Sequence, residues 1–497
     1  MADKGKILLD YTGKLLGAKL AFNGMSALND AANIPIDGPL CYDILNCDID
    51  NRGNISRRDG LTLITNAVIT SVWSNGTYVY CVSGGKICTY NNATTITPLV
   101  NSPTVNVVTE FKQVNNVVVY SDGTNVGIIE GTTLTAITTS TTFANDAAIA
   151  SHVTTNLPAN FQAAASNFEV DAFKLTTPAG RCLEFYDGKL YFAINNYLYC
   201  TKTFDVEHID IRYNVVAGFP TNITMVAKVT DGLYVGTADG TYFLSGSATE
   251  QGGFSQEQIS KFGVIYGSNI TYQSENSKAT EGVNINVYWT STNGIYSGTS
   301  GGKYKHLSED QVNMSLGTTA TALLKTFGET QQYIVCFNAD GNDTYPTWVV
   351  NTDTSAHSRY SKYTFKSLYT FNNLYYGVNA NGVYQLIGED DFGSTIDAFA
   401  QSPITDFEKT EIKAVMYAYL NLRADGDIGI DFIIDEEIER SDYMTNFDYK
   451  EGSHRRKFTF PKGLKGTNWQ FKIKNINGSY FKLFDFELKA ATLKRNI

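Results

Sequence analysis

One phrase recurs along this chain and constrains its fold more than any other feature. It is a short apolar run containing an aromatic residue, then a turn of Gly, Asn or Asp, then a second short run. Each copy predicts a β-hairpin, because the apolar residues alternate and the turn residues tolerate positive φ angles. The copies centre on Tyr80 (GTYVYCVSGGKICTY), Tyr120 (NNVVVYSDGTNVGII), Tyr191 (DGKLYFAINNYLYC), Tyr234 (DGLYVGTADGTYFL), Tyr288 (NVYWTSTNGIYSG), Ile334 (QQYIVCFNADGNDTYPTWVV) and Tyr375 (NNLYYGVNANGVYQL).

The spacing of these hairpins predicts a ring of small sheets. The intervals between the anchor residues are 40, 71, 43, 54, 46 and 41 residues, and four of the six lie between 40 and 46. A four-stranded propeller blade has a period of about 40–50 residues. One small sheet cannot bury both of its faces, whereas sheets stacked around an axis cover one another. We therefore expect a β-propeller-like domain over residues 61–395, with six or seven blades.

The 71-residue interval holds an extra segment at about residues 139–180, rich in Ala, Ser, Thr and Asn. Length outliers of this kind are often functional. We interpret the segment as an insertion projecting from one blade; the alternative is a blade whose sequence has diverged from the pattern. Together with the loop Glu389–Gly393, it is a candidate gate or docking element.

The repeat stops near residue 395, and the strands predicted over 396–497 are longer. Met416, Ala418, Leu420 and Leu422 share one face of MYAYLNLRA, which we expect to be the core side. Turn signals separate several such strands, so we expect an antiparallel β-sandwich or platform domain. Residues 1–60 are expected to form an N-terminal arm and hairpin.

Composition agrees with an all-β protein that buries a large core. The chain is 43% hydrophobic and 18% charged, with 42 Gly, 31 Tyr and 28 Phe among its 497 residues. The seven cysteines are odd in number and show no C-x-x-C spacing, which indicates reduced core thiols in a chain made in the cytosol. No secretory signal and no uninterrupted run of 18 apolar residues is present, so no membrane insertion is expected.

The sequence offers little catalytic chemistry. Its five histidines lack metal-ligand spacing from one another and from cysteine, and no nucleotide-binding or nucleophile motif appears. The acidic stretch starting at Asp425 fails as a calcium loop, because Gly429 takes a ligand position and Ile430 takes the position of the turn glycine. We therefore expect no enzymatic activity, no metal and no cofactor.

Charge is distributed unevenly. The formal net charge is −11; residues 396–497 hold 16 basic and 16 acidic residues, so residues 1–395 carry the whole acidic excess. This excess of negative charge argues against a dedicated nucleic-acid-binding surface. Within the C-terminal part, a head-to-tail ring could set an acidic cluster against a basic one, whereas the alternative for each is a solvated hairpin. These candidate inter-subunit or adaptor contacts are Asp435, Glu436, Glu437 and Glu439 on the acidic side and Arg455, Arg456 and Lys457 on the basic side.

The stretch NCDIDNRGNISRRDGLTLI, residues 46–64, concentrates charge around one turn and could be a binding site or a sheet edge. We interpret it as a hairpin, with Cys47, Ile49 and Ile55 packed inward and with Gly53 and Gly60 in turns. Its charged residues would then pair across the two strands as exposed pairs worth only ~0.2–1 kcal/mol each. These residues are Asp48, Asp50, Arg57 and Arg58.

The same stretch resembles the start of tail nozzle proteins of short-tailed bacteriophages. That family carries an early phrase N-x-D-x-D-x-x-G-x-[IVL]-x-R-R-x-G that leads into blade-like repeats. Here the phrase is carried by Asn46, Asp48, Asp50, Gly53, Ile55, Arg57, Arg58 and Gly60. The specific phrase is about 15 residues long, and the rest of the resemblance is architectural.

The resemblance implies a structural virion protein in the tail, assembled in the host cytoplasm. It would form a homohexameric ring that contacts the tail adaptor protein and fibre or spike proteins. Double-stranded DNA would pass through an acidic channel without sequence-specific binding, because an acidic wall repels phosphates. The alternative is a carbohydrate-binding or glycan-cleaving β-propeller, built from scattered blade residues that no motif reveals.

Overall fold

The computed structural model describes residues 41–90, 95–137, 174–248, 253–273, 285–309, 314–337, 345–406, 412–435, 437–444, 449–460 and 463–492. Within these ranges the regular elements are strands, apart from the 3-10 turn η3 (Ser300–Gly302). The all-β class expected from the sequence is confirmed. No helix among the described residues is long and apolar enough to cross a membrane.

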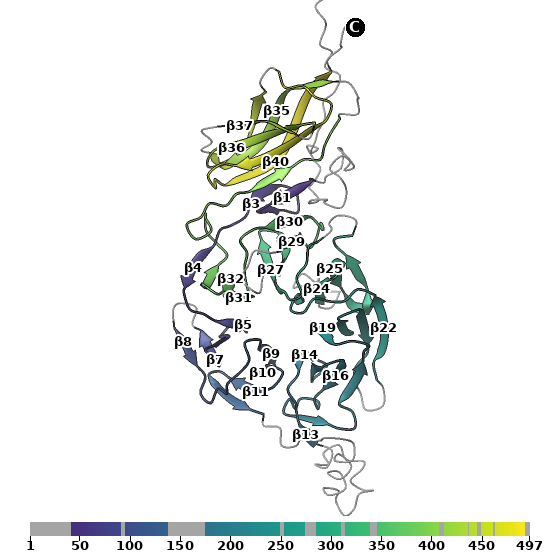
Figure 1. Ribbon diagram of the computed structural model, residues 1–497. Helices are drawn as coiled ribbons and strands as arrows, with labels where there is room; N and C mark the ends of the chain where they lie inside the picture. Colours follow the sequence, from purple (N-terminus) through teal and green to yellow (C-terminus); the bar gives the residue numbers. More distant parts are fainter. Residues whose placement is uncertain are drawn as a thin grey trace, which may run out of the picture.

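Seven four-stranded antiparallel units follow one another in the described part of the chain and are arranged as a ring (Figure 1). The first three are β5 (Thr70–Ser74), β6 (Val79–Ser83), β7 (Lys86–Tyr90) and β8 (Ile96–Pro98); β9 (Glu110–Val114), β10 (Val117–Ser121), β11 (Val126–Glu130) and β12 (Thr133–Ala136); and β14 (Arg181–Tyr186), β15 (Lys189–Ile194), β16 (Tyr197–Cys200) and β18 (Val215–Gly218).

The next three units continue around the ring. They are β19 (Ile223–Val229), β20 (Gly232–Thr237), β21 (Thr241–Ser245) and β22 (Ser255–Ser260); β23 (Ile270–Gln273), β24 (Ile285–Ser291), β25 (Gly294–Gly298) and β26 (Tyr304–His306); and β27 (Thr321–Phe327), β28 (Thr330–Cys336), β29 (Thr347–Asn351) and β30 (His357–Tyr360). A small pair, β13 (Lys174–Thr176) and β17 (His208–Asp210), accompanies the third unit.

The seventh unit closes the ring with a strand from the start of the chain. β31 (Ser367–Phe371), β32 (Leu374–Asn379) and β33 (Gly382–Gln385) are consecutive, but the fourth strand is β4 (Thr62–Thr65), which pairs antiparallel with β33. Because β4 comes directly before the first unit in the chain, its pairing in the seventh unit ties the two ends of the ring together. The segment just before β4, residues 46–60, therefore lies at the point where the chain enters the ring.

The seven hairpins predicted from the repeated phrase are confirmed as the two middle strands of the seven units. The β6–β7 turn shows the local reason. Gly84 and Gly85 have φ angles of 57° and 71°, the left-handed pair that a two-residue hairpin turn of type I′ needs. The anchor residues Tyr80, Tyr120 and Tyr191 are buried between neighbouring units.

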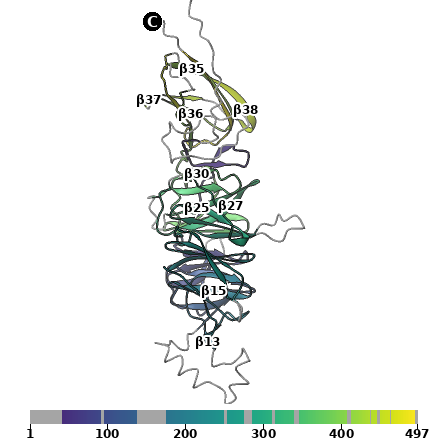
Figure 2. The ribbon, with the colours of Figure 1, turned by 90° about the vertical axis from the view of Figure 1, so that its right-hand side faces the viewer.

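The C-terminal residues extend one sheet of the ring and build a second sheet beside it, at the rim of the ring. Figure 2 shows the ring edge-on, with these sheets continuing in its plane rather than over either face. The unit β27–β30 extends through β1 (Asp43–Leu45), β34 (Phe399–Gln401), β39 (Trp469–Asn475), β36 (Ile428–Ile434) and β37 (Glu437–Met444) into one nine-stranded sheet. The second sheet is β2 (Cys47–Ile49), β3 (Ile55–Arg57), β40 (Phe481–Thr492), β35 (Lys413–Ala424) and β38 (Tyr449–Thr459).

The two C-terminal sheets enclose one core that runs into the ring without a break. Ala418, Leu420 and Leu422 of β35 are buried in it, as the alternation predicted. The same cluster includes Phe432 of β36 and Trp348 of the ring. Continuous burial across the junction favours one rigid body over two independently moving parts. The side chain of Met416 lies outside the described residues.

The N-terminal segment is distributed among three sheets. We expected an arm and hairpin over residues 1–60; of these, residues 41–60 are described, and β1 lies in the nine-stranded sheet while β2 and β3 lie in the second C-terminal sheet. β4 follows in the seventh unit. The expected insertion at about 139–180 lies largely outside the described residues, which resume at Lys174 in β13.

Candidate functional site

The first candidate site is the charged hairpin at residues 46–60, and its turn is held by a carboxylate. Asp50 accepts hydrogen bonds from the backbone N–H groups of Arg52 (3.0 Å) and Asn54 (2.9 Å), and Gly53 takes a φ of 76° in the same turn. Lys482 of β40 donates to Asp50 at 2.8 Å. Burial alone would raise the pKa of Asp50, but the hydrogen bonds from Lys482 and Asn54 outweigh it and leave the pKa lowered. The turn is thus fastened to the C-terminal sheet.

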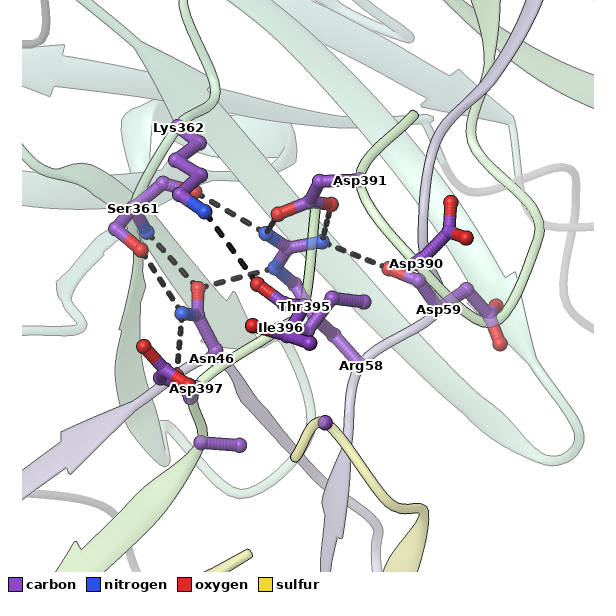
Figure 3. Close-up of polar contacts among 12 residues, drawn as sticks. Asn46, Arg58, Asp59, Ser361, Lys362, Asp390, Asp391, Thr395, Ile396 and Asp397 are labelled. Atoms are coloured by element: carbon purple, nitrogen blue, oxygen red, sulfur yellow. Dashed lines mark hydrogen bonds and ion pairs between the residues drawn. The ribbon is translucent and has the colours of Figure 1, made fainter. Parts of the chain in front are cut away.

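Arg58 is the centre of the hairpin's polar network (Figure 3). Its Nη1 and Nη2 each donate to Asp391 at 2.8 Å, in the bidentate arrangement that favours arginine. The remaining donors reach Asn46 Oδ1 (3.0 Å), Asp59 O (2.9 Å) and Ser361 O (3.1 Å), so all five N–H groups are used. The side-chain exposures of Arg58 and Asp391 are 0% and 4%. The guanidinium is therefore a structural group with no capacity left for a ligand.

Arg57 joins two different parts of the chain. Its Nη1 donates to the backbone oxygens of Glu389, in the loop after β33, and of Gly478 (3.1 Å), in the turn before β40. The guanidinium also lies over the ring of Tyr480, 5.8 Å from its centroid. These contacts connect the seventh unit of the ring to the C-terminal sheets, and Arg57 is buried between them.

Asp48 is also buried, and its partners lie on the ring. Gln332 Nε2 donates to Asp48 at 3.1 Å, and the hydroxyl of Tyr360 donates to the same carboxylate oxygen. The prediction of exposed pairing between the two strands of the hairpin is therefore wrong. Asp48 stands opposite Ser56, and Arg57 opposite Cys47. Both faces of this hairpin are covered by remote segments, and a sequence pattern does not show which segments those are.

Gly60 has a different role from the turn that we expected. A Cβ atom at this position would lie 2.0 Å from the backbone oxygen of Asp390. Gly60 N donates to Gly388 O at 2.7 Å, and Leu61 N donates to Asp390 O at 2.8 Å. Glycine is thus needed for close approach of two backbones. The loop Glu389–Gly393, a candidate gate in the sequence, is held here by these bonds and by the Asp391–Arg58 pair.

The acidic and basic clusters of the C-terminal sheets are less uniform than their sequences suggest. Asp435 has a φ of 50° and caps the turn before β39, accepting from Thr467 Oγ1 (2.7 Å) and Asn468 N (2.9 Å). These bonds, the one from Thr467 first, lower the pKa of Asp435. Glu436 lies outside the described residues, and Glu437 and Glu439 lie on β37 with side chains that are not described.

On the basic side, Arg455 and Lys457 alternate with Arg456 along β38, so they share one face of the strand. Arg455 lies over the ring of Tyr419 (4.5 Å to the centroid) and Lys457 over the ring of Tyr417 (4.1 Å). All three cations are exposed. Two cations backed by aromatic rings form an ordered positive surface, which the sequence presented only as a charge run.

The second candidate site lies on the axis of the ring and was not expected from the sequence. The first strand of each unit is an edge strand of its sheet, and these strands line two adjoining cavities of about 290 and 410 Å³. Polar side chains connect neighbouring units around the axis. In each case a side-chain oxygen of one unit accepts a hydrogen bond from a backbone N–H group of the neighbouring unit. The bridges are Ser71 to Thr109 (2.9 Å), Glu110 to Leu183 (2.9 Å), Thr321 to Leu368 (3.0 Å) and Ser367 to Val72 (3.2 Å).

A tyrosine crosses the first cavity. Tyr266, in the segment before β23, donates its hydroxyl to Glu110 of β9, so it joins units that are not neighbours in the ring. Burial raises the pKa of Tyr266, which keeps the phenol protonated and able to donate. Glu110 thereby accepts hydrogen bonds from both Tyr266 and Leu183, and it connects three units at this end of the axis.

An ion pair lies at the other end. Lys112 Nζ and Glu184 Oε1 are 2.7 Å apart, and both residues line the larger cavity. Glu184 is 2% exposed and Lys112 is 25% exposed at the side chain. Glu184 also accepts from Phe185 N at 2.9 Å. No group of three or more His, Cys, Asp or Glu side chains in the described part of the chain is placed to hold a metal ion.

The remaining chemical prediction concerns the cysteines. All seven are buried and none is in a disulfide, as expected for core thiols. Cys81 and Cys88 face each other across the β6–β7 hairpin. Burial raises the pKa of Cys81, with the neighbouring Cys88 as a second cause, so this thiol is a poor nucleophile.

Comparisons with known proteins find only distant likenesses among solved structures. No protein-family model matches the sequence, and no curated protein matches it. Among solved structures, the extracellular domain of a putative one-component system from B. thetaiotaomicron aligns at 12% identity with a TM-score of 0.40, over 66% of this chain and 40% of that one. PorZ of Porphyromonas gingivalis aligns at 10% identity with a TM-score of 0.36, over 69% and 42% of the two chains. The N-terminal domain of Nup159 aligns at 9% identity with a TM-score of 0.35, over 67% and 95%.

Proposed function

We propose that this protein is a structural component of a short bacteriophage tail, the nozzle that forms the distal DNA exit channel beneath the portal and adaptor. The observation that carries the proposal is the position of the nozzle-like phrase. Asp48, Arg57 and Arg58 are buried where the ring meets the C-terminal sheets. Asp48 binds β28 and β30, Arg58 binds the loop after β33, and Arg57 joins that loop to the turn before β40. The phrase therefore joins parts of the fold and does not form a ligand site, which suits a structural protein.

The continuous core supports the same reading. Ile44 and Cys47 of the N-terminal segment share one hydrophobic cluster with Tyr333 of the ring and Phe471 of the C-terminal sheets. A nozzle must hold its shape while internal pressure drives DNA through it, and a single core transmits load without a hinge. The chain needs no catalysis and no cofactor for this task.

The charge distribution supports an assembly in which DNA passes without being held. With a formal charge of −11 per chain, a ring of copies surrounds the duplex with net negative potential and repels its phosphates. The cations of β38 would then serve contacts between subunits or with the adaptor. The exposed positions of Arg455 and Lys457 over tyrosine rings support this role, and β37 of the next subunit would offer acidic residues.

The test is the mass and shape of the full-length protein in solution. We expect a complex of six chains of 54.7 kDa by native mass spectrometry and a ring by negative-stain electron microscopy. The double variant Arg455→Glu/Lys457→Glu should dissociate it, because like charges would then face each other. The matched control is Lys261→Glu, an exposed cation far from β38 in sequence. A monomer at all concentrations, or a ring that retains duplex DNA at low salt, contradicts the proposal.

The second candidate function is carbohydrate binding or cleavage, and the axial cavities are the observation that favours it. Two carboxylates, Glu110 and Glu184, and the aromatic residues Trp73 and Tyr369 line them. Both carboxylates are already hydrogen-bonded to the protein, which leaves less capacity for a substrate. A monomer that turns over a glycan, and loses that turnover in Glu184→Gln, would favour this function over the nozzle.

A further inference from the structure

The inference concerns one end of the larger axial cavity, where Lys112 and Glu184 line the wall and Lys228 interacts electrostatically with both. Lys112 of β9 and Glu184 of β14 stand on first strands of neighbouring units and pair at 2.7 Å. Lys228 is on β19, the first strand of the next unit, two residues after the cavity-lining Val226. Three consecutive units thus bring two lysines and one glutamate together.

Lys228 is the member of this group that has no partner of its own. Within the described residues, no hydrogen bond or ion pair engages its ammonium. Burial lowers its pKa; the charge of Glu184 raises it and that of Lys112 lowers it again, so the three groups act on one another. One carboxylate cannot neutralise two lysines, and a half-buried cation without a partner is costly.

The cavity offers what a small anion needs. Its volume of about 410 Å³ is ample for a phosphate or a small carboxylate. The first strands are edge strands that face the axis, and polar side chains already accept from the backbone N–H groups of Val72, Leu183 and Leu368 there. Hydroxyl groups of Ser74, Thr271 and Thr370 line the same space. Lysines and hydroxyl groups in a partly enclosed space bind oxyanions more strongly than they would in open water.

We propose that the end of the axial cavity between β9, β14 and β19 is a binding site for a small oxyanion carrying phosphate or carboxylate oxygens. Lys228 and Lys112 supply the charge, and Glu184 positions the Lys112 ammonium at the cavity wall. The site lies within one chain and needs no second subunit. It is therefore independent of the proposed nozzle function, and neither assignment fails with the other.

The test is calorimetric titration of the full-length protein with inorganic phosphate and, separately, with succinate at constant ionic strength. We expect saturable binding of at least one of the two anions, and their ratio shows whether phosphate or carboxylate is preferred. Lys228→Met should weaken binding at least about tenfold, equivalent to about 1.4 kcal/mol. Glu184→Gln should strengthen it, because the competing negative charge is removed while the amide oxygen still accepts from Lys112. Lys261→Met, at an exposed position, is the matched control and should bind as the wild type does.

Opposite effects of the two variants separate a binding site from a structural ion pair. A merely structural role predicts lower stability in Glu184→Gln and no change in anion affinity. If Lys228→Met does not fold, Lys112→Met takes its place. Lys112→Met should then weaken anion binding, while Glu184→Gln should strengthen it. No saturable binding of either anion by the wild type, or equal affinity in wild type and the lysine variants, overturns the proposal.

Discussion

Arg58 allows the sharpest test of how this fold is held together. Replacement by Met keeps the volume but removes five donors, and it leaves the carboxylate of Asp391 buried at 4% exposure without its partner. Breaking a buried ion pair in this way costs about 3–5 kcal/mol. The acceptors on Asn46, Asp59 and Ser361 lose their donor as well. We therefore expect Arg58→Met to lower the free energy of unfolding by about 4 kcal/mol.

The assay is urea unfolding followed by circular dichroism and tyrosine fluorescence. Arg52→Met is the matched control, because Arg52 lies in the same hairpin but is 80% exposed and stands 3.9 Å from an equally exposed Glu329. An exposed pair of this kind contributes about 0–1 kcal/mol. The double variant Arg58→Met/Asp391→Leu should recover part of the loss, since apolar replacement of both partners removes the unpaired charge. Equal losses in Arg58→Met and Arg52→Met would refute the reasoning.

Two further predictions concern close packing and pH. Gly60→Ala should destabilise the fold by about 1–3 kcal/mol, because the new Cβ would meet the Asp390 backbone oxygen at 2.0 Å; Gly253→Ala, which meets nothing within 4 Å, should be near neutral by the same thermal-unfolding measurement. His357 is buried, and burial lowers its pKa to about 3 from an ordinary 6.5. Between these values the unfolded chain binds a proton that the folded chain does not, so stability should fall as the pH drops below about 6.5, by up to about 1.4 kcal/mol per pH unit. His357→Leu should remove this contribution, and a constant difference between wild type and variant from pH 7 to 4.5 would contradict it.

Some features of the fold were determined locally and could be predicted from the sequence. Strand alternation, paired with turn residues such as Gly84 and Gly85, specified the seven hairpins. The same alternation placed Ala418 and Leu420 in the core. Side-chain period and turn geometry depend on neighbours within a few residues, so one sequence carries both signals.

The tertiary structure decided which remote segments meet. Asp48, Arg57 and Arg58 looked like members of exposed pairs, yet each is buried against a partner several hundred residues away. The closing strand β4 and the axial group of Lys112, Glu184 and Lys228 likewise arise from chain ends and separate units brought together. A charged residue on a strand has the same local pattern whether its face meets water or another sheet. Only the packing of the whole chain settles the difference, because burial turns an exposed pair worth tenths of a kcal/mol into one whose loss costs several.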